Sequence, residues 1–166
     1  MKREAPTHTK MKRLCRMLDI PLYQAVGIFE LLIHMTARER PRGDLGNGNS
    51  NEDIAIAIDW RGDPDRLIDA LVQCGFLDRY PEYRLVVHDW DEHVEDSIDL
   101  KLARAVLTYA SGQWPRMTRI AQKERKQLEQ KFREKYGPRS DVQAHKQAEC
   151  AHAVRTESHE RPRKAT

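Results

Sequence analysis

The sequence of 166 residues lacks paired cysteines and long apolar runs. Its three cysteines, Cys15, Cys74 and Cys150, are odd in number and widely spaced, which excludes a disulfide framework and fits a reducing compartment. No apolar run approaches the roughly 20 residues of a membrane helix, and the basic N-terminus is not followed by the apolar segment of a secretory signal. We therefore expect a cytoplasmic chain without a membrane partner.

Signatures of catalysis are also missing. The sequence contains no Gly-rich phosphate loop, no nucleotide motif and no paired catalytic carboxylates, so we expect no enzyme activity, no catalytic residues and no cofactor. The run HDWDEH at 88–93 resembles a metal cluster, but no second His or Cys group stands at ligand spacing. We predict no metal; Asp89 or Asp91 instead caps the following helix, and Trp90 packs beneath a hairpin.

What the chain has in abundance is charge, and the charge is segregated. One third of the residues are charged, for a net charge of +3. Residues 1–43 carry a net charge of +5, residues 44–100 of −11 and residues 101–166 of +9. Basic ends can bind nucleic acid, or they can pair with the acidic middle of the same chain or of a second copy. Both alternatives remain open from the sequence.

Periodicity and capping signals define the elements. Ser50 followed by Asp53, and Asp63 followed by Pro64, are helix starts, and Gly75 is placed to end a helix in a left-handed conformation. Together these patterns predict helices over residues 9–19, 21–39, 51–58, 64–74, 91–110 and 117–136, a β-hairpin of residues 76–80 and 83–88, and a strand stub at 43–46.

The segment 21–39 is apolar around most of its circumference, so we expect it to be the central helix of the core, surrounded on most sides. Gly27 lies inside this helix, where glycine costs about 1 kcal/mol relative to alanine. We interpret it as a point of close approach by another backbone.

The order helix, stub, helix, helix, hairpin is that of a winged helix-turn-helix, with the pair at 51–58 and 64–74 and the wing around Pro81. The predicted fold class is thus mainly α with a small β-hairpin. The expected division of the chain is a basic N-terminal helix (1–20), a winged-helix domain (21–90), a helical extension (91–136) and a disordered basic tail (137–166), which has too few large apolar side chains to order itself.

Three runs, AVGIFELLIH, IAIAIDWRGDPDRLIDALVQCGFLD and RLVVHDWDEH, resemble small phage and prophage proteins related to the N-terminal winged-helix domain of DnaD-type replication-initiation and helicase-loading proteins. The resemblance covers about residues 8–110. It implies a DNA-binding or protein-docking module of phage replication or its regulation, with a replication protein as a possible partner.

The second helix of the expected pair departs from the usual DNA reader. Its outward residues are mostly acidic, which repels phosphates. We therefore expect DNA, duplex or single-stranded, to bind the flanks and the wing. The candidate DNA-binding residues are Lys10, Lys12, Arg13, Arg16, Arg79, Arg84, Arg116, Arg119, Lys123 and Lys126.

Two alternatives compete with this hypothesis. The basic helices could be solvated faces without a ligand, or they could contact the acidic middle of the chain. The winged helix could also be an adaptor that docks a protein partner or forms a homo-oligomer. The candidate docking residues are Asp65, Arg66, Asp69 and Gln73.

Overall fold

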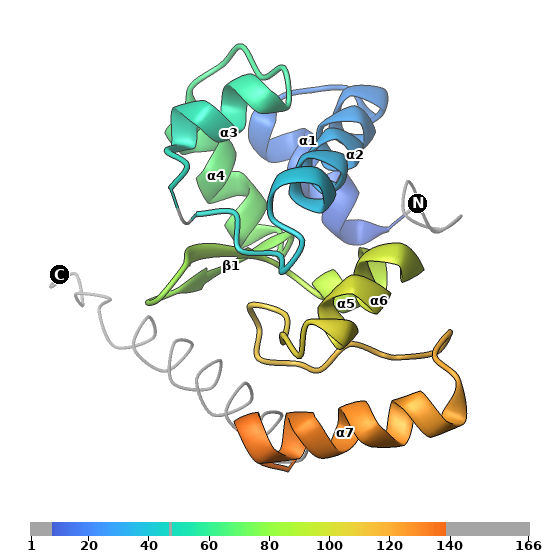
Figure 1. Cartoon of the computed structure of the whole chain (residues 1–166). Coiled ribbons are helices and arrows are strands. Elements are labelled where there is room, and N and C mark those ends of the chain that lie inside the picture. The colour runs from blue at the N-terminus through green and yellow to red at the C-terminus, as the bar shows by residue number, and fades with distance from the viewer. Residues whose placement is uncertain (1–7, 47, 139–166) are drawn as a thin grey trace, which may run out of the picture.

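The computed structural model describes residues 8–46 and 48–138, and within them the chain forms seven helices and one two-stranded sheet (Figure 1). The elements are α1 (Thr9–Leu18), α2 (Leu22–Glu39), α3 (Asn51–Ala57), α4 (Pro64–Gln73), β1 (Leu77–Tyr80), β2 (Arg84–Val87), α5 (Trp90–His93), α6 (Asp96–Arg104) and α7 (Gln122–Tyr136). The predicted mainly α chain with a small β-hairpin is confirmed. The expected disordered tail lies outside the described residues, apart from Gly137 and Pro138.

Helices α1 to α4 share one hydrophobic core with the hairpin and with the start of the C-terminal extension. Met11, Leu14 and Leu18 of α1 are at most 4% exposed, and they belong to the same cluster as the buried faces of α2, α3 and α4. The cluster, which we call the first core, continues through Trp90 and Ile98 to Tyr109. It therefore runs across residues 20 and 90, where the sequence suggested boundaries.

The predicted capping signals are confirmed. Ser50 and Asp53 form a reciprocal capping box at the start of α3, and the Asp63 side chain accepts a hydrogen bond from the Asp65 amide at the start of α4. At the end of α4 the Phe76 amide donates to the Leu71 carbonyl at 2.9 Å, with Gly75 at φ 73°. This is the Schellman arrangement that a glycine stabilises.

The hairpin carries a third extended segment. β1 and β2 pair antiparallel, with Leu77 opposite Val87. The stub expected at 43–46 forms no assigned strand, but the Val87 amide donates to the Gly43 carbonyl and the Gly46 amide donates to the Leu85 carbonyl. A Cβ on Gly46 would lie 2.4 Å from the Tyr83 carbonyl oxygen, so only glycine allows this close approach of two backbones.

The single helix expected over 91–110 is wrong. The chain forms the one-turn α5, becomes extended at Val94 and Glu95, and then forms α6, which ends at Arg104. Asp89 precedes α5 but makes no side-chain cap. After the end of α6 the buried Asp99 carboxylate accepts hydrogen bonds from the Tyr109 hydroxyl and from two loop amides, and so holds residues 109–117 in an irregular path.

The helix expected over 117–136 is too long, because α7 begins only at Gln122. Met117 and Ile120 precede α7 and pack with it in a separate cluster. This second core contains Ala103, Trp114, Met117, Ile120, Leu128 and Phe132. In Figure 1 it places α7 beyond α6, at the far end of the molecule from α1 to α4.

α2 contributes to the core as expected, but it is surrounded less completely than predicted. Its buried face includes Phe29 and Leu32, whereas Leu22 and Leu31, which the pattern placed among the apolar residues to be covered, are 42% and 43% exposed. A Cβ built on Gly27 meets nothing within 4 Å. Another backbone does not approach this glycine in the described part of the chain.

Among the described residues no single helix has the length and apolarity needed to cross a membrane. The pair α1 and α2 meets those criteria only when both helices are taken together, and they are bent by 105° at their junction.

Candidate nucleic-acid interface

The outer face of α1 carries three cations on a helix that is fixed to the domain. Lys12, Arg13 and Arg16 are exposed, whereas Met11 and Leu14 on the opposite face are at most 1% exposed. None of the three cations has a hydrogen-bond or ion-pair partner in the part of the chain that the structure describes. Their spacing places them within about 100° of the helix circumference. We call this group the α1 cationic face.

Polar contacts at both ends attach α1 to α4. The Lys10 ammonium donates to the Gly75 carbonyl at 3.1 Å, and the Arg66 guanidinium donates to the Met17 carbonyl at 2.7 Å. Each cation thus lies at a helix C-terminus, where carbonyl groups without intrahelical partners favour positive charge. Lys10 was predicted to bind DNA, but the structure gives its ammonium this internal contact.

Between the two helices lies Cys74, which is buried. Burial raises the pKa of its thiol, and the nearby Arg13 guanidinium opposes part of that rise. The Cys74 thiol also contacts the Met17 sulfur at 3.6 Å. Cys15 is only half-buried, and Cys150 lies outside the described residues.

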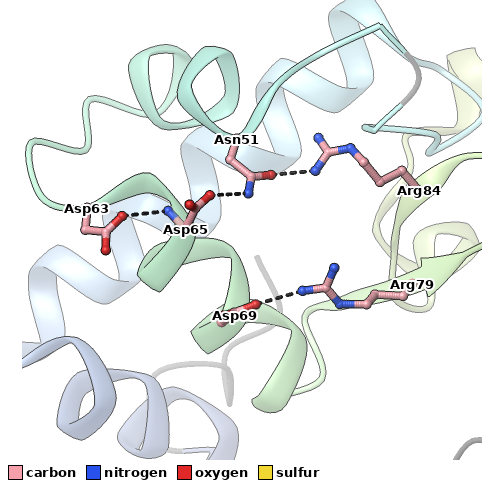
Figure 2. A network of polar contacts seen from close by, with 6 residues as sticks. All are labelled: Asn51, Asp63, Asp65, Asp69, Arg79 and Arg84. Atoms are coloured by element: carbon pink, nitrogen blue, oxygen red, sulfur yellow. Dashed lines mark hydrogen bonds and ion pairs between the residues drawn. The ribbon is translucent and has the colours of Figure 1, made fainter.

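The two arginines of the hairpin are engaged with α3 and α4 (Figure 2). Arg79 contacts the Asp69 carboxylate at 2.7 Å. Arg84, which is half-buried, donates to the Asn51 side chain and to the Asn49 carbonyl, both at 2.5 Å. Asn51 in turn donates to Asp65 at 2.7 Å. Of the expected wing cations, Arg79 is therefore ion-paired with the acidic helix and Arg84 is bound to α3 and the segment before it, so neither stands free.

The same network occupies most of the candidate docking residues. Asp65 is bound to Asn51, Asp69 to Arg79, and Arg66 to the end of α1. Gln73 is exposed. Asn51 links the wing to α4 but was not among the residues singled out from the sequence. Its position directly after the Ser50 cap marked it as a helix start, and only the fold brings it to Arg84.

The candidate cations of the C-terminal region divide in the same way. Arg119 pairs with Asp96 at 2.6 Å. Arg116 is half-buried; its guanidinium donates to the Val94 carbonyl and its backbone amide to Asp99. Lys123 and Lys126 on α7 are exposed and have no hydrogen-bond or ion-pair partner within residues 8–46 and 48–138. Figure 1 shows α1 and α7 at opposite ends of the molecule, so the two sets of free cations do not form one surface.

The His88 and Trp90 side chains of the HDWDEH run make contacts within the fold. His88 lies 2.9 Å from Asp78 through Nδ1 and 3.2 Å from Asp89 through Nε2. Trp90 is 2% exposed and donates to the Pro41 carbonyl, so it packs in the first core beside the hairpin as expected. Within the described ranges no group of three or more His, Cys, Asp or Glu residues is arranged to hold a metal ion.

Asp99 is the one carboxylate that is both buried and multiply hydrogen-bonded among the residues whose placement is described. It is 3% exposed, and its oxygens accept from the Tyr109 hydroxyl at 2.6 Å and from the Arg116 and Met117 amides at 2.8 and 3.0 Å. Burial, together with the bond to Asp99, raises the pKa of Tyr109 above its usual range. The three groups that donate to Asp99 belong to residues 109–117, so this carboxylate fixes the path of that loop.

The structure therefore leaves only some of the predicted DNA-binding residues available to a phosphate. Of the ten candidate DNA-binding residues, the ones that remain exposed and unpaired within the described chain are Lys12, Arg13, Arg16, Lys123 and Lys126.

Comparison of the chain with known proteins finds no matching family model, no matching curated protein and no matching solved structure.

Proposed function

We propose that the chain is a winged-helix module that binds nucleic acid through the α1 cationic face. The winged-helix interpretation takes α3 and α4 as the helix-turn-helix pair, β1 and β2 as the wing, and the segment 43–46 as the short third strand. The order of these elements and the hydrogen bonds from the hairpin to Gly43 and Gly46 support it.

The observation that carries the proposal is the free charge of Lys12, Arg13 and Arg16 on a helix whose other face is buried. Cations that are already ion-paired offer little to a phosphate, because the pair must first be broken. Those of α1 require no such step, and the contacts of Lys10 and Arg66 hold the helix in place. Contact with phosphates accounts for attachment to nucleic acid without sequence preference.

The acidic α4 does not read bases in this proposal. Asp63, Asp65 and Asp69 are exposed on or next to it, and a duplex approaching that helix would meet their charge. Arg79 offsets part of this negative charge through its pair with Asp69, and Arg84 is occupied by Asn51. A role in phage or prophage replication rests on the resemblance to DnaD-type proteins.

The test is fluorescence anisotropy with a labelled single strand and a labelled duplex. Three phosphate contacts predict that affinity falls about 10- to 20-fold between about 50 and 150 mM salt. The double variant Arg13→Glu, Arg16→Glu removes most of the binding. The matched control Arg61→Glu, Lys101→Glu makes the same change in net charge at two other exposed positions and retains more of it.

Absence of binding to both probes at low salt contradicts the proposal, and so does equal loss in the two double variants. A third variant, Lys123→Glu with Lys126→Glu, decides whether α7 contributes. A large loss there moves the interface to the opposite end of the molecule.

Docking of a protein partner by α4 is a second candidate function. It has less support, because Asp65, Arg66 and Asp69 already have partners within the chain. The variant Asp65→Lys, Asp69→Lys distinguishes the two. It strengthens DNA binding if α4 is excluded from DNA by charge alone, and it abolishes capture of a partner if α4 docks one.

A further inference from the structure

Helix α7 carries a second set of free cations, at the end of the molecule that lies away from α1 (Figure 1). Lys123, Lys126 and Arg133 are exposed, and their side chains have no hydrogen-bond or ion-pair partner in the described portion of the chain. Their positions along the helix place them within an arc of about 80°, on the side opposite the buried Leu128 and Phe132. We call this group the α7 cationic face.

Polar contacts near both ends attach α7 to the segment around α6. Near its start, the Arg104 guanidinium donates to the Glu124 carboxylate at 3.0 Å. Near its end, the Lys135 ammonium and the Tyr136 hydroxyl donate to the Val106 carbonyl at 3.0 and 3.1 Å. The α7 cationic face is therefore held at a fixed place on the surface, as the α1 cationic face is.

The carboxylates of α7 leave this face positive. The helix contains six basic and three acidic residues, for a net charge of +3. Glu124 and Glu129 each pair with an arginine. Glu134, which borders the face in the helical projection, accepts a hydrogen bond from the Gln130 side chain at 2.9 Å. The free cations outnumber the one carboxylate beside them, so the face keeps a positive charge that phosphates can neutralise.

An acidic segment separates the two cationic faces. Residues 89–96 contain five aspartates or glutamates and no lysine or arginine, and they include α5 and the start of α6. Figure 1 shows α5 and α6 between the bundle of α1 to α4 and helix α7. Helix α4 adds the exposed Asp63, Asp65 and Asp69 on or next to it. A phosphate backbone that ran from one face to the other would pass carboxylates that repel it, so the two faces fit two separate segments of nucleic acid.

We infer that the chain bridges two segments of nucleic acid, one on the α1 cationic face and one on the α7 cationic face. The inference rests on the proposed function, because it takes α1 as the first site. The second site is the weaker one, since the cations of α7 extend over about 15 Å of helix and those of α1 over about 6 Å. A carboxylate also borders the α7 set, whereas α1 contains no acidic residue.

The test is capture of one oligonucleotide by another through the full chain. A biotinylated probe on streptavidin beads is mixed with a fluorescent probe of non-complementary sequence, both in the form, single-stranded or duplex, that binds in the anisotropy experiment. We expect capture to rise and then fall as the protein concentration increases, because an excess of protein occupies each probe separately. Binding of a single probe without any capture overturns the inference and leaves the proposed function standing. Absence of binding to a single probe overturns both.

Two double variants assign the faces. Lys123→Glu with Lys126→Glu abolishes capture but lowers the affinity for a single probe less than about threefold, because the stronger site is intact. Arg13→Glu with Arg16→Glu removes capture and most of the single-probe binding. Capture that survives in the α7 variant overturns the inference, and so does a loss of single-probe binding as large as in the α1 variant, since the two faces would then act as one site.

A mixture of these two variants separates bridging by one chain from association of two copies. Each variant keeps one intact cationic face, so the mixture captures nothing if both faces must belong to the same chain. Restored capture in the mixture overturns the inference, because it requires copies that associate. The control Arg61→Glu, Lys101→Glu has the same change in net charge at other exposed positions, and it retains capture.

Discussion

The first core, from Met11 to Tyr109, and the second core, from Ala103 to Phe132, are built in different ways. In the first core local signals begin and end the helices, as the capping box of Ser50 and the glycine end of α4 show. In the second core a single buried carboxylate, Asp99, holds an irregular loop against α6. A segment can therefore be ordered without regular structure when one tertiary contact satisfies its backbone amides.

The largest expected effect separates the two cores. Phe132 is fully buried in the second core and its ring centroid lies 5.1 Å from that of Trp114. Phe132→Ala removes about 3–5 kcal/mol from the stability of that core. Amide hydrogen exchange then accelerates in α7 and residues 106–121 and changes little in α2 to α4.

The matched variant Leu71→Ala, at a fully buried position of the first core, accelerates exchange in α2 to α4. Equal acceleration throughout the chain in both variants would show that the two cores unfold as one cooperative unit and would contradict their independence.

A somewhat smaller effect tests the role of Asp99. Asp99→Asn replaces one acceptor oxygen by a donor that faces backbone amides, and we expect a loss of about 3 kcal/mol from the hydrogen bonds to a charged group. Urea unfolding monitored by the fluorescence of tryptophan measures it. The control Asp96→Asn breaks an exposed pair with Arg119 and costs less than about 1 kcal/mol; equal losses in the two variants contradict a special role for Asp99.

The smallest effect concerns the capping box of the first core. Ser50→Ala removes the cap of α3 and costs about 1 kcal/mol. Hydrogen bonds from the Ser50 side chain and backbone lower the pKa of Asp53 below 3.8. The carboxylate therefore contributes stability that is present above the ordinary pKa of an aspartate and is lost as the pH falls through the lower folded pKa.

Thermal unfolding of wild type and Asp53→Asn between about pH 2 and 6 measures this contribution, because the pH window follows from the direction of the shift. The difference in stability between the two chains shrinks as the pH decreases. A difference that does not change with pH would place the stabilisation in the Ser50 bond alone.

The candidate site was predictable where side-chain spacing alone decided it. Lys12, Arg13 and Arg16 fall opposite Met11 and Leu14 in the helical pattern, and the structure leaves them on the surface. The sequence alone did not distinguish Arg79 and Arg84 from the free cations of α1. Their pairing with Asp69 and Asn51 depends on a hairpin that folds back on α3 and α4, and periodicity carries no information on such distant partners.

Local chemistry in the sequence determined the starts of α3 and α4, the end of α4 and the hairpin, because capping and turn preferences act between residues close in the chain. Only the tertiary structure decided that α6 ends at Arg104, that α7 begins at Gln122 and that one face of α2 stays exposed. Those outcomes depend on which side chains meet across the fold. A buried carboxylate or an uncovered helix face has no signature until its neighbours are in place.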